Sequence, residues 1–536
     1  MPLLLAAACG LLLTLALPPL GWWPFAFAVA PVFALVARAK DGRAAFRTGA
    51  AFGLPFFALY ILWLPRSFAV LFGPAFWFVY PFLLLILATF WGLTTWGAWR
   101  VAGLAGGASS PRARAARVLL LLPLAWVLVE WARTQGYFAF PWGTLGYAWL
   151  ETPVAQLAEF GGVYGLSLLV TVPSALLAWP WAVGRARKAS LPGGATAALL
   201  AAPAPLLAAA LVAGAFVWGA AVGRGAPTLA AEAAAPYRAL LVQGNVDPFA
   251  RAAAAAQELG IHLRLTEDAS LTAGAAGPFD LVVWPEGAVI GYDLTTGDAT
   301  GLRKAITDSA PGATFVVGGR VYESSGSYNS LIALRSDAAL GHYDKHYLVP
   351  FGERWPLIDT LSGLYAAVFR AFGLPMLAGT TPGETIEPLP SPLGPLGAFV
   401  CYESVFPQVQ RLLVERGAGV LVLGTNDAWF GVGTGARQHF DMGRLRAIET
   451  RRWLLRAGND GVTAAVDPWG RVTAEVPRGV ATTLAVSFDT RDDLTFWTRY
   501  GALAPLVLLA LAGIVVAAGL ILAVRSGSRT DPAGQA

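Results

Sequence analysis

The sequence predicts a multi-span α-helical membrane bundle that carries one α/β domain outside the cytoplasm. Three observations lead to this prediction. Of the 536 residues, 56% are hydrophobic and only 13% are charged, and the mean hydropathy of +0.57 is too apolar for an ordinary water-soluble chain. Long apolar runs fill the first 224 residues and return after residue 500. Between them charged residues come back, and short strand-like runs alternate with helical patterns.

Eight apolar segments are long enough to cross a bilayer core of about 30 Å as helices of about 20 residues. They cover residues 3–20, 22–39, 48–64, 75–99, 117–134, 163–184, 196–223 and 501–524. Pro55 and Pro65 interrupt the third, and Glu130 lies in the fifth. The first could be a cleaved signal peptide with Cys9 lipidated, but it lacks a basic n-region, so we interpret it as an uncleaved span with a buried Cys9.

The Lys and Arg residues of the short loops predict the orientation of these spans. Most of them follow the even-numbered spans: Lys40, Arg43, Arg47, Arg100, Arg112, Arg114, Arg117, Arg185, Arg187, Lys188, Arg525 and Arg529. The other short loops hold Arg66 and Arg133. By the positive-inside rule, both termini are cytoplasmic and the long segment between spans seven and eight lies outside.

We therefore divide the chain into three parts: a membrane domain of about seven helices at 1–224, a domain outside the membrane at 225–495, and the last span with a short tail at 496–536. The middle part has strand-like runs such as RALLVQGN, TFVVGGR and GVLVLGTND. Helical patterns such as ARQHFDMGRLRAIETRRWLLR lie between them. Their alternation is typical of a layered α/β domain.

Reactive side chains follow three of these runs. DLVVWPEG contains Glu286 next to its end, GAFVCYE contains Cys401, and GHYDKHYLVPFGE carries Lys345 and Glu353. Residues at the carboxyl ends of strands in an open α/β sheet can meet, however far apart they are in sequence. A thiol, a carboxylate and an ammonium group are what covalent acyl transfer requires: a nucleophile, a proton acceptor and a cation for the oxyanion.

Each of these residues also has a plainer interpretation. A lone cysteine after an apolar run is more often a small core residue. Glu286 could cap a turn or a helix, and Lys345 could form a surface pair with Asp344. Each alternative is reasonable for one residue alone. The order Glu, Lys, Glu, Cys, within these local contexts, favours a shared site.

The motifs WPEG, DKHYLVPFGE, CYES and GTNDAWFG, in this order, resemble the carbon-nitrogen hydrolase (nitrilase) superfamily. A domain of this kind inserted before the last membrane span resembles the bacterial apolipoprotein N-acyltransferase family. The resemblance implies a four-layer α-β-β-α sandwich with Cys401 as nucleophile, Glu286 as general base and Lys345 as oxyanion partner. It implies supporting roles for Glu353, Tyr402 and Glu403, the backbone after the nucleophile completing the oxyanion hole.

The implied reaction passes an acyl chain from a phospholipid, typically phosphatidylethanolamine, through a thioester to the α-amino group of a lipoprotein's N-terminal diacylglyceryl-cysteine. The implied location is the bacterial inner membrane, with the catalytic domain in the periplasm. No cofactor is expected. The four histidines have no cysteine or carboxylate cluster around them, so we expect no metal site. Without a basic stripe or an aromatic-basic platform, nucleic acid is not an expected partner.

Further expectations concern substrate contact. Trp284, Asn426, Trp429 and Phe430 are candidates for a substrate pocket. The apolar segment 354–377 is either an amphipathic lid or ordinary core. The family usually has an aromatic residue, often in a Lys-Trp pair, where this chain reads NVDPFARAAAA with Ala252, and Phe249 is a neighbouring substitute.

Two other functions compete with the transferase. A membrane-anchored amidase or nitrilase would use the same nucleophile and pass its acyl group to water. A transporter or scaffold would use the outer domain only for binding, but few ionisable residues apart from Glu130 lie within the predicted spans. Seven spans ahead of the domain exceed what anchoring needs, which favours lipid substrates.

Overall fold

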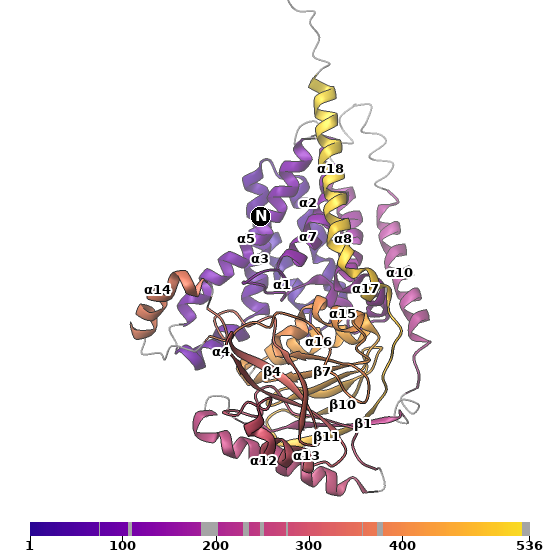
Figure 1. Cartoon of the computed structure of the whole chain (residues 1–536). Helices are drawn as coiled ribbons and strands as arrows, with labels where there is room; N and C mark the ends of the chain where they lie inside the picture. Colours follow the sequence, from indigo (N-terminus) through magenta and orange to yellow (C-terminus); the bar gives the residue numbers. More distant parts are fainter. Residues whose placement is uncertain are drawn as a thin grey trace, which may run out of the picture.

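The computed structural model has a helical bundle at one end and a strand-rich part at the other (Figure 1). It describes residues 1–73, 76–104, 110–183, 202–228, 235–246, 251–274, 277–355, 357–371, 379–431 and 433–527.

The helices of the bundle come from both ends of the chain. They are α1 (Pro2–Ala16), η1 (Trp23–Ala28), α2 (Val29–Ala37), α3 (Gly42–Tyr60), α4 (Trp63–Phe72), α5 (Phe76–Gly103), α6 (Pro111–Ala116), η2 (Arg117–Leu121), α7 (Leu122–Ala132), η3 (Leu145–Trp149), η4 (Pro153–Leu157), α8 (Ala158–Val183), α10 (Ala204–Gly223), α17 (Phe496–Tyr500), η10 (Gly501–Leu503) and α18 (Ala504–Gly527). After the strand-rich part, α18 returns to the bundle and packs against α7.

Fewer helices than predicted have the length of a full membrane span. Among the described residues, five pass on length and composition: Phe76–Gly103, Ala113–Ala132, Pro153–Val183, Ala204–Gly223 and Phe496–Ala518. The pair α3 and α4, bent by 52° at its junction, makes a sixth if it counts as one span. The apolar helices Pro2–Ala16 and Trp23–Ala37 are shorter. All eight predicted segments contain helix, and five or six of them have the length of a full span by this measure; positions 196–201 of the seventh lie outside the described residues.

The break between α3 and α4 does not lie where the prolines suggested. Pro55 stands inside α3 without ending it. The break falls at residues 61–62, and Pro65 occupies the first turn of α4, where a missing N–H breaks no helical hydrogen bond. Small residues set the packing of the bundle: a Cβ on Gly49 of α3 would lie 2.2 Å from the carbonyl oxygen of Trp91 in α5.

The strand-rich part contains two sheets. Its elements are β1 (Tyr237–Gln243), α12 (Arg251–Thr272), β2 (Leu281–Val283), η7 (Gly297–Ala299), α13 (Thr300–Asp308), β3 (Thr314–Glu323), β4 (Gly326–Arg335), β5 (Ala338–Asp344), α14 (Ile358–Ala371), β6 (Leu396–Val400), η8 (Cys401–Val405), α15 (Pro407–Glu415), β7 (Val420–Thr425), η9 (Asp427–Phe430), α16 (Gly435–Thr450), β8 (Leu454–Gly458), β9 (Thr463–Val466), β10 (Val472–Val476) and β11 (Thr482–Phe488). One sheet has the order β11-β1-β2-β3-β4-β5, the other β10-β9-β8-β7-β6. The strands β1, β2 and β3 are parallel, as are β6, β7 and β8.

The two sheets and two helix layers form an α-β-β-α sandwich, as expected. Side chains such as Leu241, Val283 and Leu331 from one sheet share a buried core with Val400 and Leu421 from the other. The helices α12 and α13 pack on the outer face of the first sheet, and α15 and α16 on the outer face of the second. In Figure 1 the layer of α15 and α16 lies between the second sheet and the membrane helices.

The helix α16 joins the sandwich to the bundle through polar contacts. Apart from Arg437, all its residues are buried, including several charged ones. The guanidinium of Arg444 donates to Glu151 at 2.5 Å, and Arg446 donates to the hydroxyl of Tyr147 at 3.2 Å. The carboxylate of Glu449 accepts from the backbone N–H of Val163 at 2.8 Å. Buried charges stay ionised only with such partners, so these contacts fix the sandwich relative to the bundle.

Candidate active site

Cys401 lies at a sharp turn between a buried strand and a buried helical turn. It directly follows β6 and opens η8. Its φ of 48° is in the left-handed region, which is costly for a residue with a side chain. Such strain persists where surrounding contacts hold it, and all five residues of η8 are buried. The thiol thus stands at the carboxyl end of β6, where the functional side chains of α/β sheets gather.

Glu286 approaches the same place from the other sheet. It follows β2 after a Trp-Pro pair and is almost fully buried. One carboxylate oxygen accepts from the Lys345 ammonium at 3.1 Å, and the other accepts from the backbone N–H of Asn426 at 3.0 Å. Gly318 gives the turn room, because a Cβ there would lie 2.1 Å from the carbonyl oxygen of Pro285. Both oxygens of Glu286 are thereby oriented.

Lys345 lies between two carboxylates at the end of β5. Its Nζ atom lies 3.1 Å from Glu286 Oε1 and 2.9 Å from Glu353 Oε2, and its side chain is only 1% exposed. Burial would lower the pKa of Lys345, but the charges of Glu286 and Glu353 outweigh it and raise that pKa above its ordinary value. Lys345 is therefore a permanent cation in the site.

Asn329, which the sequence analysis missed, joins the two glutamates. Its amide nitrogen donates to Glu286 Oε1 at 2.7 Å and to Glu353 Oε1 at 2.8 Å. Its backbone carbonyl accepts from the N–H of Lys345 at 2.8 Å. An amide is a suitable residue here because it donates to both carboxylates without adding a charge. The only sequence signal was its position within β4, which is unremarkable.

The resting thiol of Cys401 is kept neutral. Burial raises its pKa, and the negative charge of Glu286 raises it further, while Lys345 and a hydrogen bond with Thr425 act in the opposite direction. The thiolate is therefore scarce at rest. Attack by this thiol requires that its proton leave as the sulfur attacks, and Glu286 is a charged carboxylate in the same cluster.

Glu403 and Tyr402 hold the nucleophile's turn from different sides. The carboxylate of Glu403 accepts from the hydroxyl of Tyr343 at 2.9 Å and from the backbone N–H of His346 at 2.8 Å and of Val400 at 2.8 Å. Burial raises the pKa of Glu403 to about 7 against the effect of these donors. The hydroxyl of Tyr402 donates to the carbonyl oxygen of Ala139 at 2.7 Å, which ties the turn to the loop after α7.

A second polar cluster, also missed from sequence, lies behind Cys401. His439 Nε2 lies 3.0 Å from the carbonyl oxygen of Cys401 and 2.7 Å from Ser404 Oγ, and His439 Nδ1 lies 2.9 Å from Asp427 Oδ1. Arg456 donates to Asp427 Oδ2 at 2.5 Å. Although burial opposes it, Arg456 and His439 lower the pKa of Asp427. Ser404, His439 and Asp427 are the three residue types of a serine triad, but all three are fully buried, so Ser404 cannot reach a substrate. The cluster instead stabilises the turn at Cys401.

The four residues predicted for a substrate pocket lie in different places. Trp284 is fully buried on the outer face of the first sheet, where its indole N–H donates to Thr266 at 3.0 Å, so it belongs to the core under α12. Asn426 is buried beside Glu286. Phe430 packs edge-on against Trp63 of α4, with ring centroids 4.8 Å apart. Trp429 is 41% exposed.

The lid hypothesis concerns a segment that is described only in part. Within 354–377, the helix α14 covers Ile358–Ala371 and projects from the side of the molecule (Figure 1). Position 356 and positions 372–377 lie outside the described residues, as does Phe249. Ala252 lies in α12. The lid therefore remains a hypothesis. Over the described ranges no group of three His, Cys, Asp or Glu residues could hold a metal ion.

We expect the alkylation rate of Cys401 to keep rising with pH beyond the ordinary cysteine pKa of about 8.5, because burial and Glu286 suppress the thiolate. Iodoacetamide labelling followed by mass spectrometry, in a Cys9→Ala background, measures this rate. In Glu286→Gln the pH at which alkylation reaches half its maximal rate should fall, because the charge of Glu286 no longer raises the pKa of Cys401. Turnover of this variant should fall as well, because the proposed base is lost. A wild-type rate that levels off below pH 8.5 would contradict the raised pKa.

Asn329→Asp is expected to cost more activity than Asn329→Ala. Alanine removes two buried hydrogen bonds to carboxylates, which we expect to lower kcat roughly tenfold to a hundredfold. Aspartate also places a third carboxylate beside Glu286 and Glu353, with only Lys345 to balance them. Steady-state kinetics with unchanged circular dichroism would measure this difference. If both variants keep wild-type kcat, the amide does not orient the glutamates.

Family models and related proteins identify the family of the chain. Residues 9–176 match the apolipoprotein N-acyltransferase N-terminal domain, and residues 235–493 match the carbon-nitrogen hydrolase domain. An apolipoprotein N-acyltransferase of Geobacter metallireducens is 31% identical over 96% of this chain and 94% of its own length, and one of Azotobacter vinelandii is 33% identical over 93% and 91%. A solved amidase of the nitrilase superfamily from Nesterenkonia is 21% identical over 49% of this chain and 94% of its own, with a TM-score of 0.36. The chain belongs to the apolipoprotein N-acyltransferase family, membrane-bound members of the carbon-nitrogen hydrolase superfamily.

Proposed function

We propose that this protein moves an acyl chain from a membrane phospholipid to the α-amino group of a lipoprotein's N-terminal diacylglyceryl-cysteine, with Cys401 carrying the acyl group between them. Its family makes it an acyltransferase and a membrane protein. The observation that carries the proposal is the buried cluster in which Glu286, Lys345 and Glu353 are joined by ion pairs next to the thiol of Cys401.

In the first half-reaction, Glu286 takes the proton of Cys401 as the sulfur attacks the ester carbonyl of the phospholipid. The oxyanion forms beside the Lys345 ammonium and the backbone N–H that follows the nucleophile. The C–O bond then breaks, and Glu286 passes its proton to the departing glycerol oxygen. The products are a lysophospholipid and a thioester on Cys401.

In the second half-reaction, the amine of the lipoprotein attacks the thioester. Glu286 accepts a proton from the amine and returns one to the sulfur as the C–S bond breaks, which leaves an amide and the free thiol. Glu353 and Asn329 hold Glu286 and Lys345 in place through both steps, and Glu403 holds the turn of Cys401. Because the two half-reactions share one site, kinetics of the ping-pong type are expected.

We further propose the surroundings in which this chemistry occurs. The protein lies in the bacterial inner membrane with both termini in the cytoplasm and the domain of residues 225–495 outside, an orientation that the basic residues of the short loops support. The membrane part at 1–224 and the last span at 496–536 give both lipid substrates lateral access to the site. We propose phosphatidylethanolamine as the donor and Asn426, Trp429 and Phe430 as contacts for the substrate. No cofactor enters any step.

Intact-protein mass spectrometry tests the proposed function. Purified protein incubated with phosphatidylethanolamine is expected to gain the mass of one acyl chain, and a diacylated lipopeptide is expected to remove it while an N-acylated product appears. An adduct removed equally fast by water alone would make the protein a lipid hydrolase. An active preparation that never carries the adduct would rule out the thioester.

A further inference from the structure

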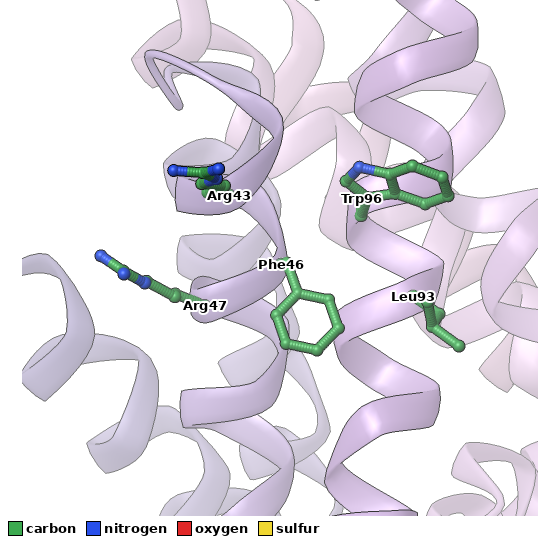
Figure 2. Close-up of a pocket in the computed structure, with 5 residues that line it drawn as sticks. All are labelled: Arg43, Phe46, Arg47, Leu93 and Trp96. Atoms are coloured by element: carbon green, nitrogen blue, oxygen red, sulfur yellow. The ribbon is translucent and has the colours of Figure 1, made fainter.

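A pocket lies between α3 and α5 in the bundle, far from the catalytic cluster. It has a volume of about 280 Å³ and is lined by Arg43, Phe46 and Arg47 of α3 and by Leu93 and Trp96 of α5 (Figure 2). Gly92 of α5 leaves room for Phe46, because a Cβ at this position would lie 2.7 Å from the ring of Phe46. The aromatic ring therefore rests directly on the backbone of α5.

The pocket opens at the end of the bundle opposite the sandwich. The carbonyl oxygen of Tyr60, at one end of α3, accepts from Gln438 of α16 at 3.0 Å, so this end adjoins the sandwich. Arg43 lies near the other end of this 19-residue helix, roughly 25 Å away at 1.5 Å per residue. That separation is close to the bilayer core of about 30 Å. The pocket is thus at the membrane surface farther from the catalytic site.

The two arginines that line the pocket favour the binding of an anion. Arg43 and Arg47 are four residues apart, hence on one face of α3, and both are exposed. Within the described parts of the chain, neither guanidinium has an ion-pair or hydrogen-bond partner. Like charges one turn apart are unfavourable unless an anion lies between them, and guanidinium groups match phosphate oxygens in geometry.

The other wall suits a lipid rather than a free ion. Leu93 and Trp96 are 50% and 42% exposed, and the outward face of α5 continues with the exposed side chains of Phe82, Leu85 and Ile86. An indole at the level of the head groups and an apolar strip leading into the bilayer fit a phosphate head group and its acyl chains. The zwitterionic head group of phosphatidylethanolamine would bring an ammonium towards two arginines.

We propose that this pocket binds an anionic phospholipid of the leaflet opposite the catalytic domain. Arg43 and Arg47 hold its phosphate, Phe46 and Trp96 flank the head group, and the acyl chains lie along α5 from Leu93. The site is separate from the acyl-donor site at Cys401, so its occupant is bound and not consumed.

Native mass spectrometry of the full-length protein in detergent tests the proposal. Wild type is expected to retain phosphatidylglycerol at concentrations where phosphatidylethanolamine is lost, and Arg43→Gln/Arg47→Gln is expected to bind phosphatidylglycerol at least roughly tenfold more weakly. The control is Arg38→Gln/Lys40→Gln, which removes the same charge from exposed positions in the loop before α3 and should bind as wild type does. Both variants should keep acyl-transfer activity, which shows that they are folded.

Three outcomes would overturn the proposal. Equal losses in the two double variants would mean general attraction to a basic surface and no site. Equal retention of both phospholipids by wild type would remove the preference for an anionic head group. Displacement of phosphatidylglycerol by millimolar inorganic phosphate would mean a site for free phosphate.

Discussion

Cys401→Ser is expected to abolish acyl transfer, with a loss in kcat/KM of roughly 10⁴-fold or more, and to leave no acyl adduct in the intact mass. A serine hydroxyl is a far weaker nucleophile than a thiol at neutral pH, and the proposed base, Glu286, is a carboxylate rather than the histidine that activates the serine of a catalytic triad. The two side chains are nearly the same size, so the turn at φ 48° and the contacts of η8 should persist. Initial rates and intact mass measure the effect.

Cys9→Ser provides the matched control for this substitution. The chain has two cysteines, and Cys9 lies buried in α1. The Cys9 variant should form the adduct and turn over at close to the wild-type rate. Normal N-acylation by Cys401→Ser, with melting unchanged in both variants, would assign the nucleophile to another residue.

The sequence predicted the strands of the sandwich correctly where an apolar run is separated from the neighbouring helical pattern. RALLVQGN, TFVVGGR and GVLVLGTND are β1, β3 and β7. The expected helix ARQHFDMGRLRAIETRRWLLR was wrong at its end, because α16 stops at Thr450 and the last leucines begin β8. Arg451 adopts a left-handed φ of 51°, which usually requires glycine or asparagine. No residue type in the sequence marked this turn. It is stabilised by hydrogen bonds that the buried side chain of Arg451 donates to Glu159 and Gln156.

The candidate site was predictable where chemistry and motif coincide. Cys401, Glu286 and Lys345 are reactive residue types near the ends of apolar runs, and their order within the chain carried the inference. Asn329 and His439 could not be found in this way. Their roles come from partners 43 and 38 residues away in the chain: Asn329 of β4 meets Glu286 within the first sheet, and His439 meets Cys401 where α16 packs on the second sheet. Trp284 was placed wrongly for a related reason: its side chain points to the opposite face of the sheet from the interior shared by the two sheets.

Lys345→Met is expected to destabilise the protein and to end catalysis. Methionine fills the same volume but leaves Glu286 and Glu353 facing each other without their shared cation. Removing one partner of a buried ion pair typically costs about 3–5 kcal/mol. The carboxylates can relieve the repulsion only by binding a proton, which removes the base that Cys401 needs, so kcat should fall by roughly 10³-fold or more. Thermal unfolding in detergent and initial rates measure the two effects.

The pH dependence separates this electrostatic effect from a loss of packing. In Lys345→Met the two facing carboxylates repel each other only when both are ionised, so the added instability is absent in acid, where the unfolded chain also keeps its carboxyl groups protonated, and grows as pH rises above the ordinary glutamate pKa of about 4.3. The difference in melting temperature from wild type should therefore be small near pH 4.5 and large near pH 7.5. Lys304→Met removes a surface lysine that is paired with Asp308 and has a side chain 65% exposed, and it should leave the melting temperature close to that of wild type at both pH values. A deficit in Lys345→Met that is the same at both pH values would mean that lost packing, and not the uncompensated carboxylates, destabilises the fold.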